Sequence, residues 1–361
     1  MATGVSVTPE VAWSARGTTP KEIAAALSRL AGDRDGGRPL AYAPARVLNL
    51  VTVVERARRD ELVERLERLG RLHTSRTFVC VISDGERRDL DAFATMSCEL
   101  PSHPGGLAVC RERVEIELGR GQLSRLESIL DPLLVGDVPT VVWSPRHREA
   151  VDAMLAAAQV VLVDSGEQPD PAAALVRAAE LAHEAQVVDL AWLRTTPWRE
   201  RLAAAFDPPA QRDMLARIDC VTVRHEPAAA SSGLLLVGWL CAQLGWAGRG
   251  RLAGDRGGSI TGSADGPENQ VELRLEPVDG QSAPGLAGVT VGGPGGSLSL
   301  DRGPGGLAAR ERRPDGRERA WTAIGASRGE PGILADGLRA ALSDDLAYGP
   351  ALRSAAVMLA A

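Results

Sequence analysis

The sequence predicts a two-domain protein with an α/β first domain and an α+β second domain. At 361 residues the chain exceeds the size of one ordinary hydrophobic core. Its first half alternates strand-like apolar runs with helical patterns, whereas from Gly248 onward it is rich in glycine and proline with short alternating segments. We expect an N-terminal lead and short helix over residues 1–44, an α/β domain over 45–166 and an α+β domain over 167–361.

The first domain is expected to hold a mixed, mostly parallel sheet covered on both faces. Residues 45–55 (ARVLNLVTVVE) form a nearly continuous apolar run that is typical of a strand buried on both faces. Residues 1–19 are interpreted as a poorly ordered lead, and Thr19 is placed to cap a helix over 20–30. The other predicted elements are helices at 58–70, 122–134 and 147–157, strands at 77–82, 138–143 and 160–163, and a hairpin of 93–100 with 107–118.

The second domain is expected to hold an antiparallel meander with flanking helices. A polar stretch at 165–171 separates the halves, and the region 248–329 supplies short strands, of which Val271–Leu275 alternates most clearly. No function is inferred for this glycine-rich region. The other predicted elements are helices at 172–185, 190–193, 198–206, 232–244, 333–342 and 350–359, and a strand at 218–223.

Charge and composition argue against nucleic-acid binding. The formal net charge is −6, whereas a nucleic-acid binder needs a basic face to meet phosphates. Aromatic residues make up 3% of the chain, which also disfavours a base-stacking platform. We expect no nucleic-acid partner.

No serine–histidine–acid or cysteine–histidine arrangement can be assembled from motifs in the sequence, and no cofactor or metal motif is recognised. Lys21 is the only lysine and lies in no phosphate-loop or Schiff-base context. The turn after the first buried strand, Glu55 to Arg59, has no glycine, so the dinucleotide-binding fingerprint is absent. There is no CxxC pair and no HxxxH or HxxE pair. We therefore expect no catalytic residue, no cofactor and no metal.

One short segment is a candidate anion site. His73, Ser75 and Arg76 precede the second strand, and these side chains could hold a phosphate or carboxylate. The alternative is a solvated loop whose hydroxyls bond their own backbone.

Two cysteines lie on opposite arms of the predicted hairpin. Cys98 and Cys110 could face each other there, either as two buried thiols or as a redox-active pair. Cys80 and Cys241 lie inside apolar runs and are expected in the core.

The most distinctive segment is DLAWLRTTPWRE, residues 189–200. Asp189 is placed to cap one helical turn, and Thr196 with Pro197 to begin the next helix. The segment also holds the four partner-binding candidates. These are Trp192, Arg194, Trp198 and Arg199, of residue types that interface hot spots favour. The alternative is that both rings join the two domains while the arginines pair with acidic neighbours.

The sequence predicts a cytoplasmic protein with reduced thiols and no membrane partner. The N-terminus lacks the charged start and apolar run of a signal peptide. The most apolar stretch, 233–246, is shorter than the roughly 20 residues that span a bilayer and contains Gln243.

Several segments of the sequence together resemble one known protein family. DLAWLRTTPWRERLAAAFD, with ARVLNLV, HTSRTFV and DPLLVGDVPTVVWSP before it and LLLVGWLCAQLGW after it, resembles the glucose-6-phosphate dehydrogenase assembly protein family, OpcA. The matches follow in order over residues 45–246. The resemblance implies a non-enzymatic assembly factor or allosteric activator whose partner is glucose-6-phosphate dehydrogenase, in the oxidative pentose phosphate pathway. The alternative is an enzyme or sensor that binds a sugar phosphate or nucleotide in a cleft between the domains.

Overall fold

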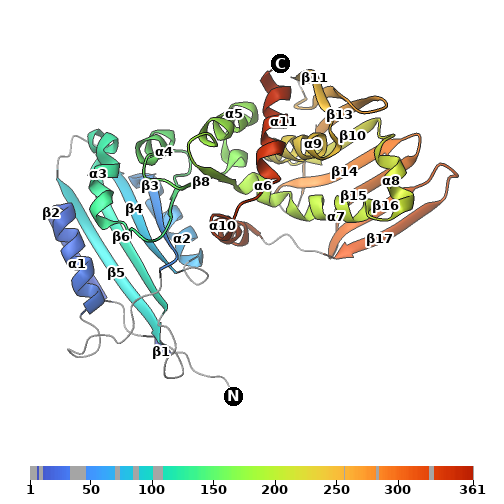
Figure 1. The fold of residues 1–361 in the computed structure, drawn as a ribbon. Coiled ribbons are helices and arrows are strands. Elements are labelled where there is room, and N and C mark those ends of the chain that lie inside the picture. The colour runs from blue at the N-terminus through green and yellow to red at the C-terminus, as the bar shows by residue number, and fades with distance from the viewer. Residues whose placement is uncertain are drawn as a thin grey trace. The chain divides into compact units, whose positions relative to one another are not determined.

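The computed structural model describes residues 6–7, 11–32, 46–69, 74–83, 89–100, 109–255, 257–281, 284–324 and 329–360. The chain divides into two compact units (Figure 1). The first unit comprises Met1–Val163 with Glu184–Val187, and the second comprises Asp164–His183 with Val188–Ala361. The domain limits at 166 and 167 remain a prediction.

The first sheet is mixed and mostly parallel, as predicted. Its described strands run in the order β1-β5-β6-β4-β3-β7-β8-β9, with β2 also paired to β5. The pairs β3–β4, β3–β7, β4–β6 and β7–β8 are parallel, whereas β5 pairs antiparallel with β6, β1 and β2. The strands are β1 (Ser6–Val7), β2 (Val11–Thr18), β3 (Leu48–Glu55), β4 (Ser75–Ser83), β5 (Leu90–Leu100), β6 (Val109–Gly119), β7 (Thr140–Trp143), β8 (Val160–Val163) and β9 (Gln186–Asp189).

The central strands of this sheet could be predicted from the sequence because they are buried on both faces. All residues of β3 but the last are buried, and so is every residue of β7, because both strands have paired neighbours on each side and apolar side chains on each face. The helices of the first unit are α1 (Pro20–Gly32), α2 (Arg59–Leu69), α3 (Leu126–Leu130) and α4 (Arg148–Met154). Thr19 caps α1 as predicted, in a reciprocal capping box with Glu22.

Two predictions for this unit were wrong. Val11–Thr18 is a strand paired with β5, not part of a poorly ordered lead, and its alternating half-exposed pattern is the weak signal of an edge strand. The helix predicted at 122–134 is instead a 3₁₀ turn (Arg120–Arg125), the short α3 and a second 3₁₀ turn (Asp131–Leu133). Pro132 in that last turn has no amide hydrogen to continue an α-helix. The predicted hairpin turn between residues 100 and 107, and Gly70 at the end of the helix predicted over 58–70, lie outside the described residues.

The second sheet confirms the antiparallel meander and adds a central strand. Its described strands run in the order β11-β12-β13-β10-β14-β15-β16-β17, and all neighbours are antiparallel except β10 and β13 (Figure 1). They are β10 (Cys220–His225), β11 (Ala247–Gly254), β12 (Ile260–Asp265), β13 (Gln270–Pro277), β14 (Leu286–Gly293), β15 (Gly296–Gly303), β16 (Gly306–Arg312) and β17 (Glu318–Ile324).

Alternation along these strands gives the second sheet one buried face. Val271, Leu273 and Leu275 of β13 are fully buried while the residues between them are exposed. The described helices are α5 (Pro171–Leu181), α6 (Leu190–Arg194), α7 (Thr196–Phe206), α8 (Pro209–Leu215), α9 (Ala230–Leu244), α10 (Gly329–Ala340) and α11 (Tyr348–Ala360). The sequence interpretation missed α8 and the strand β9.

Helix α9 is buried in the core of this unit. It contacts β10, β13 and α11, and eleven of its fifteen residues are buried. Within the described residues, Pro227–Leu244 is the one helical segment long and apolar enough to cross a membrane by length and composition, and 67% of it is buried inside the structure.

Candidate functional site

The distinctive segment at 189–200 begins at a buried carboxylate in the second unit. Asp189 ends β9 and is fully buried, and its Oδ1 accepts hydrogen bonds from the amides of Ala191 (2.9 Å) and Ser165 (3.1 Å). This confirms Asp189 as the cap of α6. The next helix, α7, is preceded by Thr195 rather than Thr196 as its N-cap residue, and the Thr195 hydroxyl bonds the carbonyl of Trp192.

Burial changes the ionisation of this carboxylate. Removal from water, together with the nearby charge of Asp164, raises the pKa of Asp189 to about 6. The hydroxyl of Tyr348 donates to Asp189 Oδ2 over 3.5 Å, and burial followed by the Asp189 charge raises the pKa of Tyr348 well above its ordinary value. Tyr348 is therefore a neutral donor.

Trp192 links α6 to the start of α11. Its ring is buried, its Nε1 donates to Asp345 Oδ2 at 2.6 Å, and its centroid lies 5.6 Å from that of Tyr348. The other carboxylate oxygen of Asp345 accepts from the amide of Ala347. One indole thus contacts two residues that are more than 150 positions away in the sequence.

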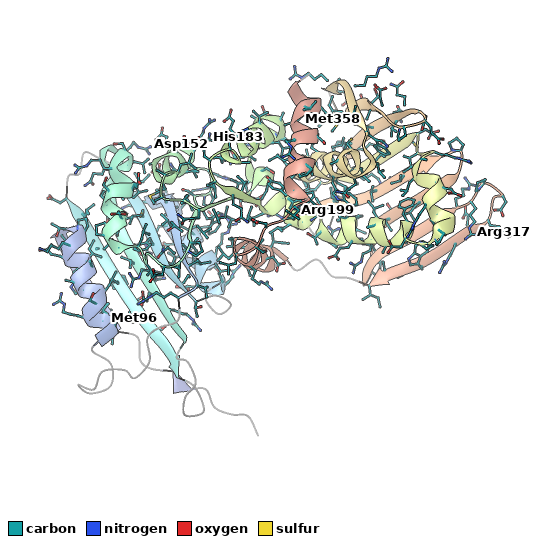
Figure 2. All side chains as sticks on the ribbon, viewed as in Figure 1. Met96, Asp152, His183, Arg199, Arg317 and Met358 are labelled. Atoms are coloured by element: carbon teal, nitrogen blue, oxygen red, sulfur yellow. The ribbon has the colours of Figure 1, made fainter. Side chains whose placement is uncertain are left out.

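Arg199, which Figure 2 labels, lies over the ring of the same indole. Its Cζ lies 3.5 Å from the Trp192 ring centroid, and its guanidinium donates to the hydroxyls of Thr195 (2.9 Å) and Thr196 (3.0 Å). Burial lowers the pKa of Arg199 to about 10, partly offset by the charges of Asp345 and Glu200. The side chain is therefore still a cation at neutral pH.

The remaining partner-binding candidates also have internal contacts. Arg194 forms a two-pronged ion pair with Asp164, both bonds being 2.8 Å long, and both side chains are largely buried. Trp198 is 2% exposed. The segment therefore brings Trp192 and Arg199 together in a buried network, while Arg194 and Trp198 make separate contacts. A role of these four residues in binding a partner remains a prediction.

The anion-site candidates are only partly described. His73 lies outside the described residues, and the Ser75 hydroxyl is 3.0 Å from that of Thr77. Arg76 donates to Glu112 Oε2 (2.7 Å) and to the carbonyl of Leu133 (2.7 Å). Glu112 is 2% exposed, so Arg76 already neutralises a buried carboxylate of the chain itself. An external anion at this position remains a prediction.

The turn after β3, Glu55 to Arg59, contains no glycine that would let a pyrophosphate approach the backbone. Glu55 ends β3, and its Oε1 lies 2.6 Å from Arg120 Nη2 and 3.3 Å from His147 Nε2. These contacts gather side chains at the carboxyl end of the parallel strands, where dinucleotide-binding folds leave room for a pyrophosphate.

The cysteines behave as the sequence indicates where the structure describes them. Cys98 and Cys110 are direct register partners across the β5–β6 pair, and whether they are redox-active remains a prediction. Cys80 and Cys241 are buried, and burial raises the pKa of each to about 12. Among the described residues, no group of three or more His, Cys, Asp or Glu side chains could hold a metal ion.

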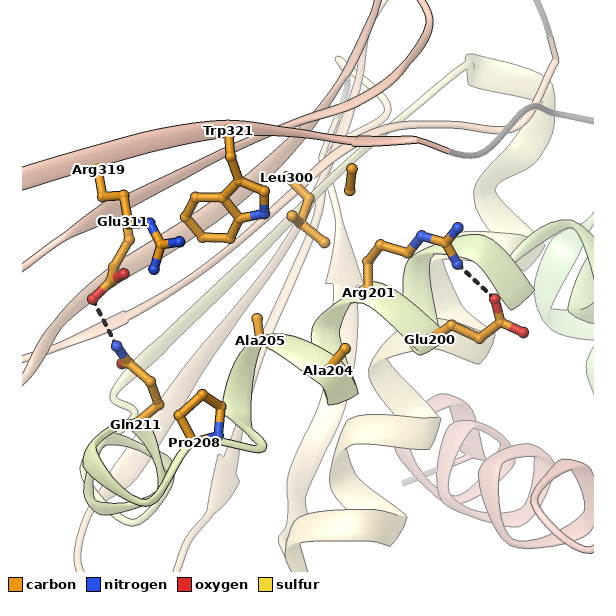
Figure 3. A pocket seen from close by; sticks show the side chains of 11 residues that line it. Glu200, Arg201, Ala204, Ala205, Pro208, Gln211, Leu300, Glu311, Arg319 and Trp321 are labelled. Atoms are coloured by element: carbon orange, nitrogen blue, oxygen red, sulfur yellow. Dashed lines mark hydrogen bonds and ion pairs between the residues drawn. The ribbon is translucent and has the colours of Figure 1, made fainter.

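The structure also shows a cavity that the sequence interpretation missed. It has a volume of about 410 Å³, and it lies between α7, α8 and the strands β15, β16 and β17 (Figure 3). The tryptophan of β17, Trp321, forms one wall with Arg319. One pattern in the sequence could have pointed to this cavity: Arg319, Trp321 and Ala323 alternate along one strand, in a region otherwise poor in large side chains.

The protein has two parts: an α/β unit with a mixed sheet, and an α+β unit with a mostly antiparallel sheet. The second unit also holds the buried network of Trp192 and Arg199. Two family models match the chain in order. One describes the N-terminal domain of the glucose-6-phosphate dehydrogenase subunit and matches residues 66–180, and the other describes the C-terminal domain and matches residues 185–352. The chain belongs to the glucose-6-phosphate dehydrogenase assembly protein family, OpcA, and this confirms the resemblance drawn from the sequence.

Curated relatives carry the same family name. One relative, from Synechococcus elongatus, is named as an OxPP cycle protein, OpcA. It is 28% identical over 225 residues, which cover 60% of this chain and 48% of the relative. A Nostoc punctiforme protein of the same name is 30% identical over 45% of this chain and 36% of its own length. The matched region thus spans about half or less of these relatives. Among solved structures, an aldose-aldose oxidoreductase from Caulobacter crescentus is similar over 87% of this chain and 96% of its own, with 13% identity and a TM-score of 0.47.

Proposed function

We propose that this protein is a non-enzymatic partner of glucose-6-phosphate dehydrogenase, which it assembles or activates allosterically. The observation that carries the proposal is the match of both family domains, in order, over residues 66–180 and 185–352. Because the names of the relatives refer to the OxPP cycle, we place the chain in the oxidative pentose phosphate pathway. Its expected compartment is the cytoplasm.

The chemistry of the described residues supports a binding role. At the carboxyl end of β3, Glu55 contacts Arg120 and His147 where a dinucleotide-binding enzyme would have a glycine turn. In the 189–200 segment, Asp189, Arg194 and Arg199 are each engaged by other groups of the chain. A fully bonded network of this kind makes the structure around it rigid. Rigidity lowers the entropy cost of binding a protein partner.

Linkage explains how such a partner acts. A protein that binds the active oligomer of an enzyme more tightly than its inactive form shifts the population toward the active oligomer. The size of the shift depends only on the difference between the two binding free energies. The activator therefore needs no catalytic residue, and its effect saturates once every binding site is filled.

Sedimentation of mixtures tests this proposal directly. The cognate dehydrogenase is mixed with increasing amounts of this protein, and we expect a new, faster-sedimenting species that contains both chains. Equilibrium dialysis of the isolated protein against glucose 6-phosphate and NADPH tests the enzyme or sensor alternative, since an assembly factor binds neither. Separate sedimentation at every ratio, or saturable binding of either small molecule, would contradict the proposal.

A further inference from the structure

The outermost strand of the second sheet, β17, is an open and regular edge. It pairs with β16 in unbroken register from Arg312–Glu318 to Gly306–Ile324, and within the described residues no strand pairs with its other side. Five of its seven residues are exposed, and Ile324 is 84% exposed. Such an edge presents unpaired amide and carbonyl groups to any extended chain that approaches.

The opposite edge of the same sheet is protected. The register of β11 shifts against β12 between Arg249 and Ala253, and α11 packs on this strand. Bulges and covering helices are the means by which proteins block strand addition. Strand β17 has no bulge, no proline and no lysine, so the two edges of one sheet differ in their readiness to accept another strand.

Cavities flank β17 on both faces of the sheet. The inner cavity, of about 410 Å³, is lined by Arg319, Trp321 and Ala323 together with α7 (Figure 3). The outer cavity, of about 360 Å³, is lined by Ala320, Trp321 and Thr322 of the same strand. Successive side chains of a strand point to opposite faces. A strand added to β17 would therefore direct alternate side chains toward the two cavities.

Charge at the inner cavity indicates the chemistry of the added strand. The buried Glu311 accepts from Gln211 (2.7 Å) and Arg313 (2.9 Å), and its cross-strand partner is Arg319. The Glu311 carboxylate thus faces two guanidiniums, whereas the other two charged residues of the cavity lining, Glu200 and Arg201, pair with each other. The surroundings of Glu311 therefore carry an excess positive charge. Arg319 also lies over the Trp321 ring, with its Cζ 5.2 Å from the centroid. An acidic side chain suits this end of β17.

The other end of β17 is apolar. The indole of Trp321 lies next to Leu300, Ala204 and Ala205 in the inner cavity, and Ile324 presents a large exposed apolar surface at the end of the same strand. Arg201 Nη2 donates to the carbonyl of Ile324 at 2.8 Å and holds this end of the strand against α7. The edge is therefore fixed in an extended conformation before any partner arrives, which lowers the entropy cost of binding.

We propose that the dehydrogenase docks by adding an extended segment to β17, with an acidic side chain near Arg319 and apolar side chains beside Trp321 and Ile324. This inference rests on the proposed function and names the surface that carries it. Main-chain hydrogen bonds to the edge supply affinity, and the two cavities supply specificity, as in other cases of strand addition.

A matched pair of substitutions tests the edge. Thr322→Glu puts a charge into the outer cavity, where an added strand would cover and desolvate it, whereas Thr261→Glu makes the same change at an exposed position on β12 of the same sheet. We expect Thr322→Glu to weaken binding to the full-length dehydrogenase by about tenfold or more, and Thr261→Glu to leave it within about twofold. Trp321→Ala should weaken binding as strongly, with thermal melting as the check on folding.

Hydrogen exchange supplies a readout that is specific to strand addition. In the complex, amides of β17 should exchange more slowly while those of β11 are unchanged. Equal binding by the wild-type chain and Thr322→Glu, without protection of β17, would overturn the edge inference and leave the assembly role intact. Failure of the wild-type chain to bind would overturn both. Protection of β17 that depends on this chain's concentration and not on the dehydrogenase would show self-pairing and overturn the inference.

Discussion

The guanidinium of Arg199 lies over the indole of Trp192, with 3.5 Å between Cζ and the ring centroid. The same indole donates to Asp345, and the same guanidinium donates to two threonine hydroxyls. One stacked pair therefore joins α6, α7 and the segment that leads into α11. Because both groups are largely removed from water, their attraction is stronger than that of an exposed pair.

Removal of this cation should destabilise the second unit. Arg199→Ala is expected to lower the free energy of unfolding by about 1–2 kcal/mol, the range for a desolvated cation–π contact with its hydrogen bonds. Arg199→Lys should recover only part of the loss, because an ammonium group lacks the planar fork that stacks and donates to both threonines. Urea unfolding measures both variants. Arg212→Ala, at an exposed position on α8, is the control, and a loss no greater than that of the control would contradict this account.

Trp198 should contribute as a large core side chain. With 2% of its surface exposed, its replacement by alanine is expected to cost about 3–5 kcal/mol and to lower the melting temperature. Trp321→Ala, at a half-buried ring on the open edge, should cost less. Differential scanning calorimetry compares the two. An unchanged melt for Trp198→Ala would show that the ring is not part of the core.

Asp189 should give the protein a pH-dependent stability with a defined sign. Its folded-state pKa of about 6 exceeds the ordinary value of 3.8, so between these values the folded chain holds a proton that the unfolded chain has lost. Its contribution to the free energy of unfolding therefore falls as the pH rises through this window, by a total on the order of 3 kcal/mol.

Asp189→Asn tests this sign, because asparagine still caps a helix but does not ionise. The stability of the wild-type chain relative to this variant should decrease from about pH 4 to about pH 6.5, as measured by urea unfolding at each pH. Asp170→Asn, at the exposed cap of α5, should show no such trend. Parallel curves for the wild-type chain and Asp189→Asn would contradict the raised pKa.

Elements with a strong local signal could be predicted from the sequence. The apolar run at β3 and the alternation at β13 predicted the two sheets, because burial on two faces and on one face impose different residue patterns. Strand β2 was missed because an edge strand needs few apolar residues. The insertion of β10 between β13 and β14 depends on long-range pairing, which periodicity does not encode.

The site was harder to predict than the fold. Residue type and spacing singled out Trp192 and Arg199, and helix capping singled out Asp189. Their partners Asp345 and Tyr348 come from a distant part of the chain, so no local pattern connects them. The open edge at β17 was missed for the same reason, since only the order of strands in the folded sheet shows which strand is outermost.

Activation of a dehydrogenase by binding is the proposed function of this chain. Its most direct test is a titration of the cognate glucose-6-phosphate dehydrogenase with this protein, followed by steady-state kinetics and sedimentation at every ratio. We expect a saturable rise in activity or a saturable shift in oligomer distribution, with no turnover by this protein alone. A flat kcat, KM and oligomer distribution at saturating concentrations would contradict it.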